Sequence, residues 1–464
     1  MSSPKPRVTG SPTADHRWHG WHGWHGWHGW RVLAVLLLAT LVAMLVTSAV
    51  LVALELLPPG AVANDAPEQL QALAAPALIE RGAYLARAGN CAACHTQRGG
   101  PSYAGGRAIE TPFGAVFAGN LTPAPGGGLG GWQSGDFWRA LHEGRSRDGR
   151  LLTPAFPYPH FTRISRADSD ALWAHLRSQP AVERAPTPHQ LRWPYGTQPA
   201  LAAWRLLYFR AGSFEPQPDR SAVWNRGAYL VEGLGHCSAC HAPRNAAGAG
   251  SSLADAVGRP SGAGLLLQQG WVAPSLTDPG HPGVAGRSAD ELVQLLKTGV
   301  SPRAAVMGPM AEVVAGSTQH LHTDDLQAMV HYLHSLVPEG SWQAPAATAS
   351  NRAASGRPAE VMALGEKLYT RHCADCHGSQ GQGAPGIYPP LAGNRTVTMD
   401  PPRNLLQAIT QGGFPPATAG NPRPYGMPAF DLLHDELAAL GTWLRASWGH
   451  DASALSTVEV LKAR

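Results

Sequence analysis

The longest apolar stretch of the chain lies near the N-terminus and predicts a helix that crosses a membrane. Residues 32–57 are apolar except for Thr40, Thr47, Ser48 and Glu55. A helix over this range reaches roughly 39 Å, because each residue adds about 1.5 Å along the axis. That length spans the hydrocarbon core of a bilayer with some tilt.

Basic residues flank this run on one side only. Four of them precede it, the last being Arg31, and none follows before Arg81. The side of a membrane helix that is richer in Lys and Arg faces the cytoplasm. The sequence therefore predicts a cytoplasmic tail, a single transmembrane anchor and an outer part that contains everything after residue 57.

Removal of the apolar run as a signal peptide is the competing interpretation. The small residues at positions 61–63, Ala-Val-Ala, resemble a signal-peptidase site. The run is longer than the usual signal core of about 7–15 residues, which favours an uncleaved anchor. The tail before it repeats Trp-His-Gly from Trp18 to Trp30. Its histidines could bind a metal ion, but a disordered tail without a site is the favoured interpretation.

Beyond residue 76, the apolar positions follow one plan three times. A helix that carries a glycine and an aromatic residue is predicted around residues 81–85, 226–230 and 365–369. An amphipathic helix closes each repeat, at residues 170–176, 324–336 and 435–448. The glycine would let the closing helix cross closely, with the aromatic residue packed beside it. We therefore expect a mostly α-helical fold of three tandem units behind one N-terminal transmembrane helix.

Composition sets the boundaries between these units. A stem rich in Pro and Ala covers residues 58–76, and a stretch rich in Ala, Ser and Gly begins at Pro338. The predicted parts are a tail at 1–31, an anchor at 32–57, units at 77–211 and 220–338, a linker at 339–358 and a third unit at 359–450.

The composition of the 464-residue chain argues against several classes of function. Its 53 glycines and 41 prolines leave little room for a large sheet or a long bundle. The formal charge of +4 is too weak to indicate a nucleic-acid partner. The sequence contains no recognisable nucleophile with an adjacent base, paired carboxylates or phosphate loop. We therefore expect no catalytic site on this chain.

The strongest chemical signal is that all six cysteines fall in Cys-x-x-Cys-His motifs. The pairs are Cys91 with Cys94, Cys237 with Cys240, and Cys373 with Cys376. This spacing is the attachment signature of c-type haem. A zinc site would need further ligands close to each pair, and a thioredoxin-like dithiol would not explain the three trailing histidines. We predict three covalently bound haem c groups.

Each haem iron needs two axial ligands from the chain. The histidine of each motif is the predicted ligand on one face: His95, His241 and His377. Electron-transfer cytochromes fill the other face with Met or His. Met310 and Met427 stand beside prolines in loops before the closing helices, and they are predicted for the second and third haems. Met307 is the near competitor of Met310.

The first unit contains no methionine, so its haem needs a different sixth ligand. His160 stands in the corresponding loop and is the predicted ligand. The alternatives are His142, His175 or His189, or an open five-coordinate iron. Because His/Met ligation raises the reduction potential relative to two histidines, we expect the first haem to have the lowest potential and to receive electrons first.

The chain resembles the triple-haem cytochrome c subunits of membrane-bound bacterial dehydrogenases. This family includes subunits of alcohol, gluconate and aldehyde dehydrogenases, and of nicotinate- and isoquinoline-type molybdenum hydroxylases. The resemblance covers roughly residues 78–450 and is carried by residues 224–236, 308–314, 317–319 and 388–394. The alcohol dehydrogenase branch has methionine where this chain has Phe156. Residues 156–162 are more similar to the nicotinate branch.

The resemblance implies three cytochrome c domains and a partner that carries the catalytic site. For the nicotinate branch, the partner is a molybdopterin subunit with a small iron–sulfur subunit; a quinoprotein or flavoprotein is the alternative. The expected function is electron transfer from that dehydrogenase to ubiquinone or a terminal oxidase, at the periplasmic face of the bacterial inner membrane. Peroxidase or small-ligand chemistry at an open first haem is the alternative function.

Overall fold

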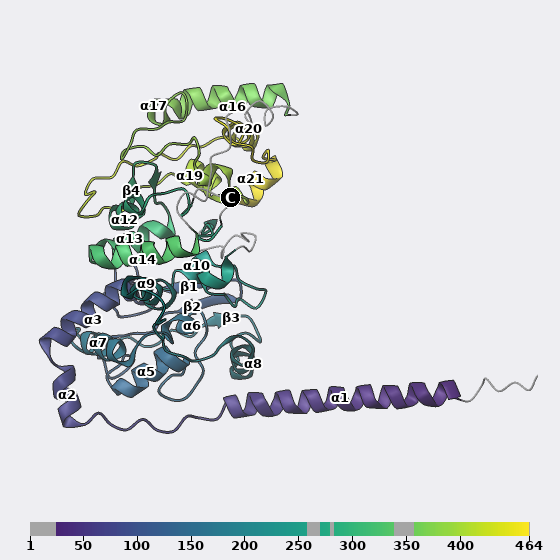
Figure 1. The fold of residues 1–464 in the computed structure, drawn as a ribbon, viewed down its shortest axis with the longest axis vertical. Helices are drawn as coiled ribbons and strands as arrows, with labels where there is room; N and C mark the ends of the chain where they lie inside the picture. Colours follow the sequence, from purple (N-terminus) through teal and green to yellow (C-terminus); the bar gives the residue numbers. More distant parts are fainter. Residues whose placement is uncertain (1–24, 258–269, 279–282, 338–356, 464) are drawn as a thin grey trace, which may run out of the picture. The chain divides into compact units, whose positions relative to one another are not determined.

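The computed structural model describes residues 25–257, 270–278, 283–337 and 357–463 (Figure 1). Most of the Trp-His-Gly tail and nearly all of the predicted linker at 339–358 lie outside the described residues. The chain divides into two parts, Met1–Glu55 and Leu56–Arg464.

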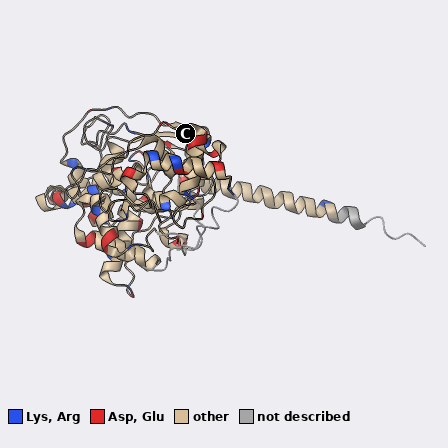
Figure 2. Cartoon of the chain, turned by 90° about the horizontal axis from the view of Figure 1, so that it is seen from above, with Lys and Arg blue, Asp and Glu red and all other residues tan. Residues whose placement is uncertain are grey.

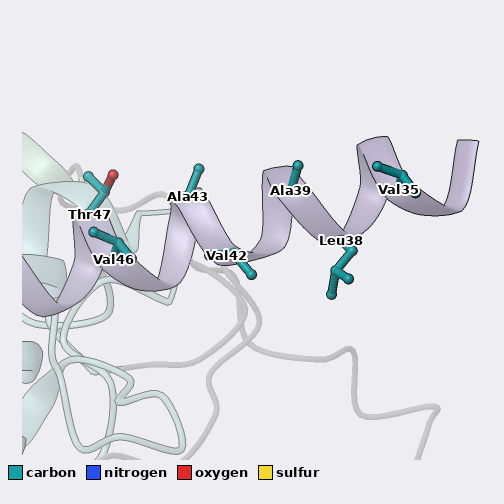
Figure 3. A pocket seen from close by; sticks show the side chains of 7 residues that line it. All are labelled: Val35, Leu38, Ala39, Val42, Ala43, Val46 and Thr47. Carbon is teal, nitrogen blue, oxygen red and sulfur yellow. The ribbon is translucent and has the colours of Figure 1, made fainter. Parts of the chain in front are cut away.

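The N-terminal part is one helix, α1 (His25–Glu55). Among the described residues, its stretch Trp30–Glu55 is the only helix long and apolar enough to cross a membrane. Figure 3 shows side chains projecting from this helix in different directions, with the hydroxyl of Thr47 as their only polar group. All side chains from Trp30 to Val50 are exposed. Such a surface suits a helix surrounded by lipid.

Helix α1 ends two residues before the predicted end of the apolar run. Pro58 and Pro59 follow Leu57, and a residue before proline is kept out of the helical region. Figure 2 shows the helix free of charged residues over most of its length, whereas both signs of charge are scattered over Leu56–Arg464. The helix thus fits a membrane anchor by composition as well as by length.

The stem after α1 is packed rather than extended into solvent. It contains α2 (Pro67–Leu73) and contacts the N-terminal half of α5 (Ser134–Glu143). Arg139 donates to the backbone oxygen of Gly60 at 2.8 Å, and the Ser134 hydroxyl donates to Asp65 at 2.6 Å. The stem therefore belongs to the same packed body as the first predicted unit.

Three helix pairs form the framework of this body, as the repeated pattern predicted. Each pair joins the helix before a cysteine motif to the closing helix of the same segment. The pairs are α3 (Pro76–Ala88) with α7 (Arg166–Arg177), α9 (Ala222–Ala228) and η1 (Tyr229–Leu234) with α14 (Thr323–Leu336), and α16 (Ala359–His372) with α20 (His434–Leu444). The three segments are called first (residues 67–209), second (222–337) and third (357–463).

A glycine lies at the crossing of every pair, which confirms the packing expected from the sequence. A Cβ at Gly82 would stand 1.8 Å from the backbone oxygen of Ala171. The corresponding distances are 2.0 Å from Gly227 to Ala328 and 2.5 Å from Gly365 to Ala439. Aromatic rings lie beside the second and third crossings, at 5.2 Å between Trp224 and Tyr332 and 4.7 Å between Tyr369 and Trp443. Larger residues at these glycines would force the helices apart.

A third helix in each segment ends at a left-handed glycine. These helices are α5, α12 (Ala289–Thr298) and α19 (Arg403–Gln411), and the glycines are Gly144, Gly299 and Gly412. An antiparallel pairing begins directly after each glycine: it is tight in the first two segments, whereas in the third it joins Gly413 to Met427 across a longer loop. In the second segment this pairing is formed by β4 (Val300–Ser301) and β5 (Ala304–Ala305). The repeated order of helix, glycine and turn makes the loops that follow comparable between segments.

The remaining elements are short and connect this framework. They are α4 (Cys91–His95), β1 (Ala108–Thr111), β2 (Gly114–Phe117), α6 (Tyr158–Phe161), β3 (Gln190–Leu191), α8 (Gln198–Tyr208), α10 (Ser238–His241), α11 (Leu253–Ala256), α13 (Pro309–Gly316), η3 (Thr318–His320), α17 (Ala374–His377), α18 (Arg395–Thr398) and α21 (Thr457–Ala463). Strands β1, β2 and β3 pair antiparallel. Helix α21 packs on α19 and α20, so the third segment continues beyond residue 450.

The hydrophobic core is divided unequally among the segments. One cluster runs through the first and second segments and includes Leu85, Trp173, Leu234 and Met329. The third segment has its own cluster around Leu437. The first two segments therefore share a common interior, whereas the third is packed separately.

Candidate haem-binding sites

Each Cys-x-x-Cys-His motif lies in a short helix directly after the first long helix of its segment. In the first two segments, the residue before the first cysteine has a left-handed backbone, with φ of 50° at Asn90 and 40° at His236. This conformation is uncommon outside glycine and interrupts the helix before the motif. Cys91 and Cys237 thus begin a new element in both segments.

The three motif histidines have the same hydrogen-bond pattern. The Nδ1 atom of each lies within hydrogen-bond distance of a backbone oxygen: His95 to Gly119 at 2.7 Å, His241 to Pro274 at 2.7 Å and His377 to Pro389 at 3.0 Å. A histidine that ligates a metal through one nitrogen commonly donates from the other to such an oxygen. Burial lowers the pKa of all three, which favours the neutral, ligating form.

The cysteines suit thioether attachment better than redox or zinc chemistry. Burial raises the pKa of Cys91 and of Cys237 to about 12 and that of Cys373 to about 11, so these thiols are protonated. Reactive dithiols and zinc ligands need a stabilised thiolate instead. Within the described residues, no cluster of three His, Cys, Asp or Glu side chains is arranged to hold a bare metal ion. The residues present therefore fit haem c.

Met427 lies in a loop whose backbone is fixed on both sides. Its N–H donates to Gly413 at 2.8 Å, and its carbonyl accepts from Gly413 at 2.9 Å. This bridge ties the loop to the turn after α19, and the side chain packs against the core of the third segment. These contacts fix the backbone of the loop, and the role of Met427 as an axial ligand stays a prediction.

Met310 occupies the first turn of α13, after the left-handed Gly308. A Cβ at Gly308 would lie 2.6 Å from the Trp271 ring, so the glycine allows the loop to pass close to that ring. The competitor Met307 points elsewhere, since its Cε lies 3.1 Å from the Cβ position of Gly413 in the third segment. The choice of Met310 over Met307 stays a prediction.

Two further methionines have packing roles in the structure. Met329 on α14 is 4% exposed and belongs to the common core of the first two segments. Met399 is 5% exposed, and its sulfur accepts from Asn404 at 3.6 Å. Buried contacts of this kind explain both residues without iron ligation.

The first segment departs from the other two at the sixth-ligand position. The segment that follows Gly144 and its turn contains Phe156 and no methionine, whereas Met310 and Met427 follow Gly299 and Gly412. His160 comes four residues later, on α6, and its Nδ1 lies 3.3 Å from the Ser238 hydroxyl. Its contacts are thus with the second cysteine motif, so ligation of the first haem by His160 stays a prediction.

Burial, with His236 nearby, lowers the pKa of His160 to about 3, and a hydrogen bond to the backbone of Glu232 opposes this shift. The ring is therefore neutral and held by the second segment. The other candidate ligands His142 and His189 also have hydrogen-bond partners. His142 lies 2.9 Å from the Thr162 oxygen, and His189 accepts from Phe117 at 3.2 Å. None of these contacts singles out a replacement ligand.

Comparisons with known proteins agree with this arrangement. The cytochrome c family model matches residues 79–180 and 362–448. The chain is 38% identical to the cytochrome c subunit of the quinone alcohol dehydrogenase of Gluconacetobacter polyoxogenes, over 84% of each chain. The chain belongs to the cytochrome c subunits of dehydrogenases.

Two other relatives of this cytochrome c subunit come from different dehydrogenases. The gluconate 2-dehydrogenase cytochrome c subunit of Pantoea cypripedii is 34% identical over 82% of this chain and 88% of its own length. A nicotinate dehydrogenase subunit of Pseudomonas putida is 42% identical over 82% of this chain, which spans only 31% of that protein. A cytochrome c subunit carries covalent haem c and transfers electrons, while the catalytic subunit is another chain.

Sequence reasoning missed one set of polar residues in the first two segments. Tyr84 contacts Asp325, and Tyr229 contacts Asp168, so each tyrosine reaches across to the other segment. The signal available in the sequence was the repeated Arg-Gly-Ala-Tyr at residues 81–84 and 226–229. That repeat was interpreted only as a helix-packing pattern.

Proposed function

We propose that the chain carries three covalent haems and relays electrons from a partner dehydrogenase to ubiquinone or a terminal oxidase. The observation that carries this proposal is the repeated motif histidine whose Nδ1 faces a backbone oxygen. Three such sites in one chain, each beside a Cys-x-x-Cys pair, support a multi-haem carrier. Each haem, when bound, would take up and release one electron at its iron.

The residues of the chain would hold and insulate these haems. Cys91, Cys94, Cys237, Cys240, Cys373 and Cys376 would form the thioethers, and His95, His241 and His377 would ligate the irons. Met310 and Met427 would ligate the second and third irons, and His160 is the sequence-based candidate for the first. The buried side chains around the motifs would exclude water, which limits the reorganisation that accompanies each change of charge.

The partner is proposed from the relatives. The similarity to the nicotinate dehydrogenase subunit favours a molybdopterin subunit with an iron–sulfur subunit, whereas the alcohol and gluconate relatives keep a quinoprotein or flavoprotein open. We propose that helix α1 anchors the chain in the bacterial inner membrane with its haem-binding part in the periplasm. Covalent attachment of haem c outside the cytoplasm agrees with that orientation.

A second function is favoured by one observation in the first segment. The segment that follows Gly144 contains Phe156 and no methionine, while His160 contacts the second segment. If no other residue ligates the first iron, that haem would bind small ligands such as carbon monoxide. Small-ligand or peroxidase chemistry is therefore the alternative proposal.

Two measurements on purified, membrane-extracted protein test these proposals. A pyridine haemochrome assay should give three haems per chain, and a clearly smaller number would contradict the multi-haem relay. Carbon monoxide added to the reduced protein should leave the spectrum unchanged if all three irons have two axial ligands. A carbon monoxide complex at one third of the haem would favour the alternative. Identification of the co-purifying subunits would show which class of dehydrogenase is the partner.

A further inference from the structure

Two tyrosines connect the first and second segments in a reciprocal way. The hydroxyl of Tyr84, on α3 of the first segment, donates to Asp325 at 2.5 Å on α14 of the second. The hydroxyl of Tyr229, in the second segment, donates to Asp168 at 2.5 Å on α7 of the first. Each segment therefore donates one tyrosine hydrogen bond to the closing helix of the other.

The contacts at the two ends match in detail. The Tyr84 oxygen also accepts from the backbone N–H of His322 at 3.2 Å, and the Tyr229 oxygen accepts from Ser165 at 3.2 Å. His322 and Ser165 are the N-cap residues of α14 and α7. Each tyrosine thus helps to cap a closing helix of the neighbouring segment, where backbone N–H groups lack partners within the helix.

Each aspartate is also held by an arginine of its own segment. Arg81 donates to Asp168 at 3.0 and 2.5 Å, and Arg226 donates to Asp325 at 2.8 and 2.7 Å. The carboxylates would keep these charged partners if the tyrosine hydroxyls were removed. Loss of a tyrosine hydroxyl should therefore weaken the link between the segments while each segment keeps its own fold.

The third segment has no tyrosine at the corresponding position. The position two residues after the crossing glycine is Tyr84 in the first segment, Tyr229 in the second and Lys367 in the third. Its contacts with the second segment are of another kind, such as the two hydrogen bonds between Asn404 and the backbone of Val272. The reciprocal link thus distinguishes the first two segments from the third.

The linked segments bring two cysteine motifs together. Arg107 donates to Ala93 inside the first motif at 2.6 Å and to Glu312 of the second segment at 2.8 Å. A second contact joins the segments at the other motif, because the Nδ1 of His160 in the first segment lies 3.3 Å from the Ser238 hydroxyl inside the second motif. Both motifs therefore lie at the boundary between the two segments.

We propose that the first and second segments form one fixed two-haem unit, in which Tyr84 and Tyr229 are positioning residues for direct electron transfer between the first two haems. The inference rests on the proposed haem relay. Electron tunnelling falls steeply with distance, so a relay gains speed when two haems cannot drift apart. The shared core holds the two segments together, and the reciprocal link adds one fixed contact at each closing helix, which limits rotation between the segments.

The test is the double variant Y84F/Y229F in the full chain. Phenylalanine keeps the rings and removes the two hydroxyls. Y332F is the matched control, because Tyr332 donates to the buried Glu232 within the second segment and crosses no boundary. After flash reduction by a photosensitiser, we measure electron redistribution among the haems, together with magnetic coupling between oxidised haems by electron paramagnetic resonance.

We expect the double variant to keep its haem content, to lose magnetic coupling and to redistribute electrons about tenfold more slowly. A hydrogen bond to a charged group contributes enough for such a factor in the docking equilibrium. Y332F should match the unchanged protein in both readouts. Unchanged coupling and rate in Y84F/Y229F, or equal losses in Y332F, would overturn the proposal. Because no partner enzyme is involved, failure here is distinguishable from failure of the proposed function, which the haem assay and co-purification test.

Discussion

At the scale of single residues, the crossing glycines and the aspartates of the reciprocal link are the positions where small changes have large effects. At each glycine the obstacle is a backbone oxygen, which cannot move without moving a helix. At each aspartate, a buried charge depends on a few donors. Backbone contact and buried charge are both poorly tolerant of substitution.

Gly82→Ala should therefore destabilise the first segment by about 3 kcal/mol, the upper end of overpacking costs. Its Cβ would stand 1.8 Å from the Ala171 oxygen, so α3 and α7 must separate. Denaturant unfolding of the haem-loaded protein measures the change. Gly212→Ala is the control, because a Cβ at Gly212 meets nothing within 4 Å. Equal stabilities of the two variants would contradict the packing described for the helix pair.

The link between the first two segments should weaken in acid. Burial alone would raise the pKa of Asp325, but hydrogen bonds from Arg226 and Tyr84 lower it below the ordinary value of 3.8. A carboxylate with a lowered folded pKa stabilises the native state above the ordinary value, and this contribution is lost as the pH falls through the folded pKa. Unfolding free energy should thus fall more steeply with acidification in the unchanged protein than in Asp325→Asn. If the unfolding free energies of the two proteins changed in parallel with pH, the Asp325 carboxylate would not stabilise the link.

At the scale of elements, the loops that follow the left-handed glycines decide the chemistry of each segment. The helix and the glycine repeat, and the segment that follows carries Met310 on α13, Met427 in a loop, or Phe156. We expect this combination of a fixed helix end and a variable segment to let one fold offer different axial ligands. The third segment shows the strongest support, because Met427 is bridged to Gly413 on both backbone atoms.

Met427→Leu should open one haem of the three to carbon monoxide and lower its reduction potential, because the thioether ligand is replaced by an alkyl group. Met399→Leu is the matched control, since Met399 is buried in the same segment but contacts Asn404. That variant should keep the ligand set while losing some stability. Carbon monoxide difference spectra and redox titration distinguish the two. Carbon monoxide binding in the Met399 variant alone would show that the ligand is misassigned.

At the scale of the whole molecule, one apolar helix and one packed body have different tasks. Helix α1 is exposed from Trp30 to Val50 and uncharged over its centre, whereas the body from Leu56 onward carries every cysteine motif. The stem is packed on the body, so the anchor would be joined to it by a short connection. Within the described residues, the helix that fits a membrane anchor therefore lies in the N-terminal part.

The full chain should remain in membranes after a carbonate wash, and its N-terminal sequence should include the region before residue 57. A chain that starts at Leu56 behind a cleavable export signal should carry the same haem and appear in the soluble periplasmic fraction. Mass spectrometry of the full-length product supplies the deciding measurement. A mature chain that begins just after Ala63 would show that the apolar run is a removed signal peptide.

The sequence predicted the parts of the fold that depend on local spacing. Cysteine motifs, crossing glycines and amphipathic helices all leave signals within a few residues, and the helix pairs lie where these signals placed them. The end of α1 was predicted two residues late, because the hydrophobic pattern continues through Leu57 while the two prolines stop the helix. Helix α21 was missed because the third unit was ended at residue 450.

Contacts between segments could not be predicted in the same way. Nothing near Tyr84 indicates that its hydroxyl binds Asp325, which lies far along the chain, and only the folded arrangement reveals the exchange. His160 illustrates the same limit. Its loop matched the ligand loops of the other segments, but its contact with Ser238 depends on how two segments meet. Local pattern specifies each segment, whereas surface complementarity decides their assembly.

The shared interior of the first two segments has a consequence for how this protein can be shortened or extended. A chain that stops after Val337 would keep that interior whole, whereas one that stops after Phe209 would remove the partners of Tyr84 and Phe161, which contact the rings of His322 and His236. Adding or removing a segment should therefore disturb the hydrophobic core less at the junction before the third segment than at the junction between the first two. The first two segments thus share one core, whereas the third has its own core and is joined to the second by polar contacts such as those of Asn404 and Thr418.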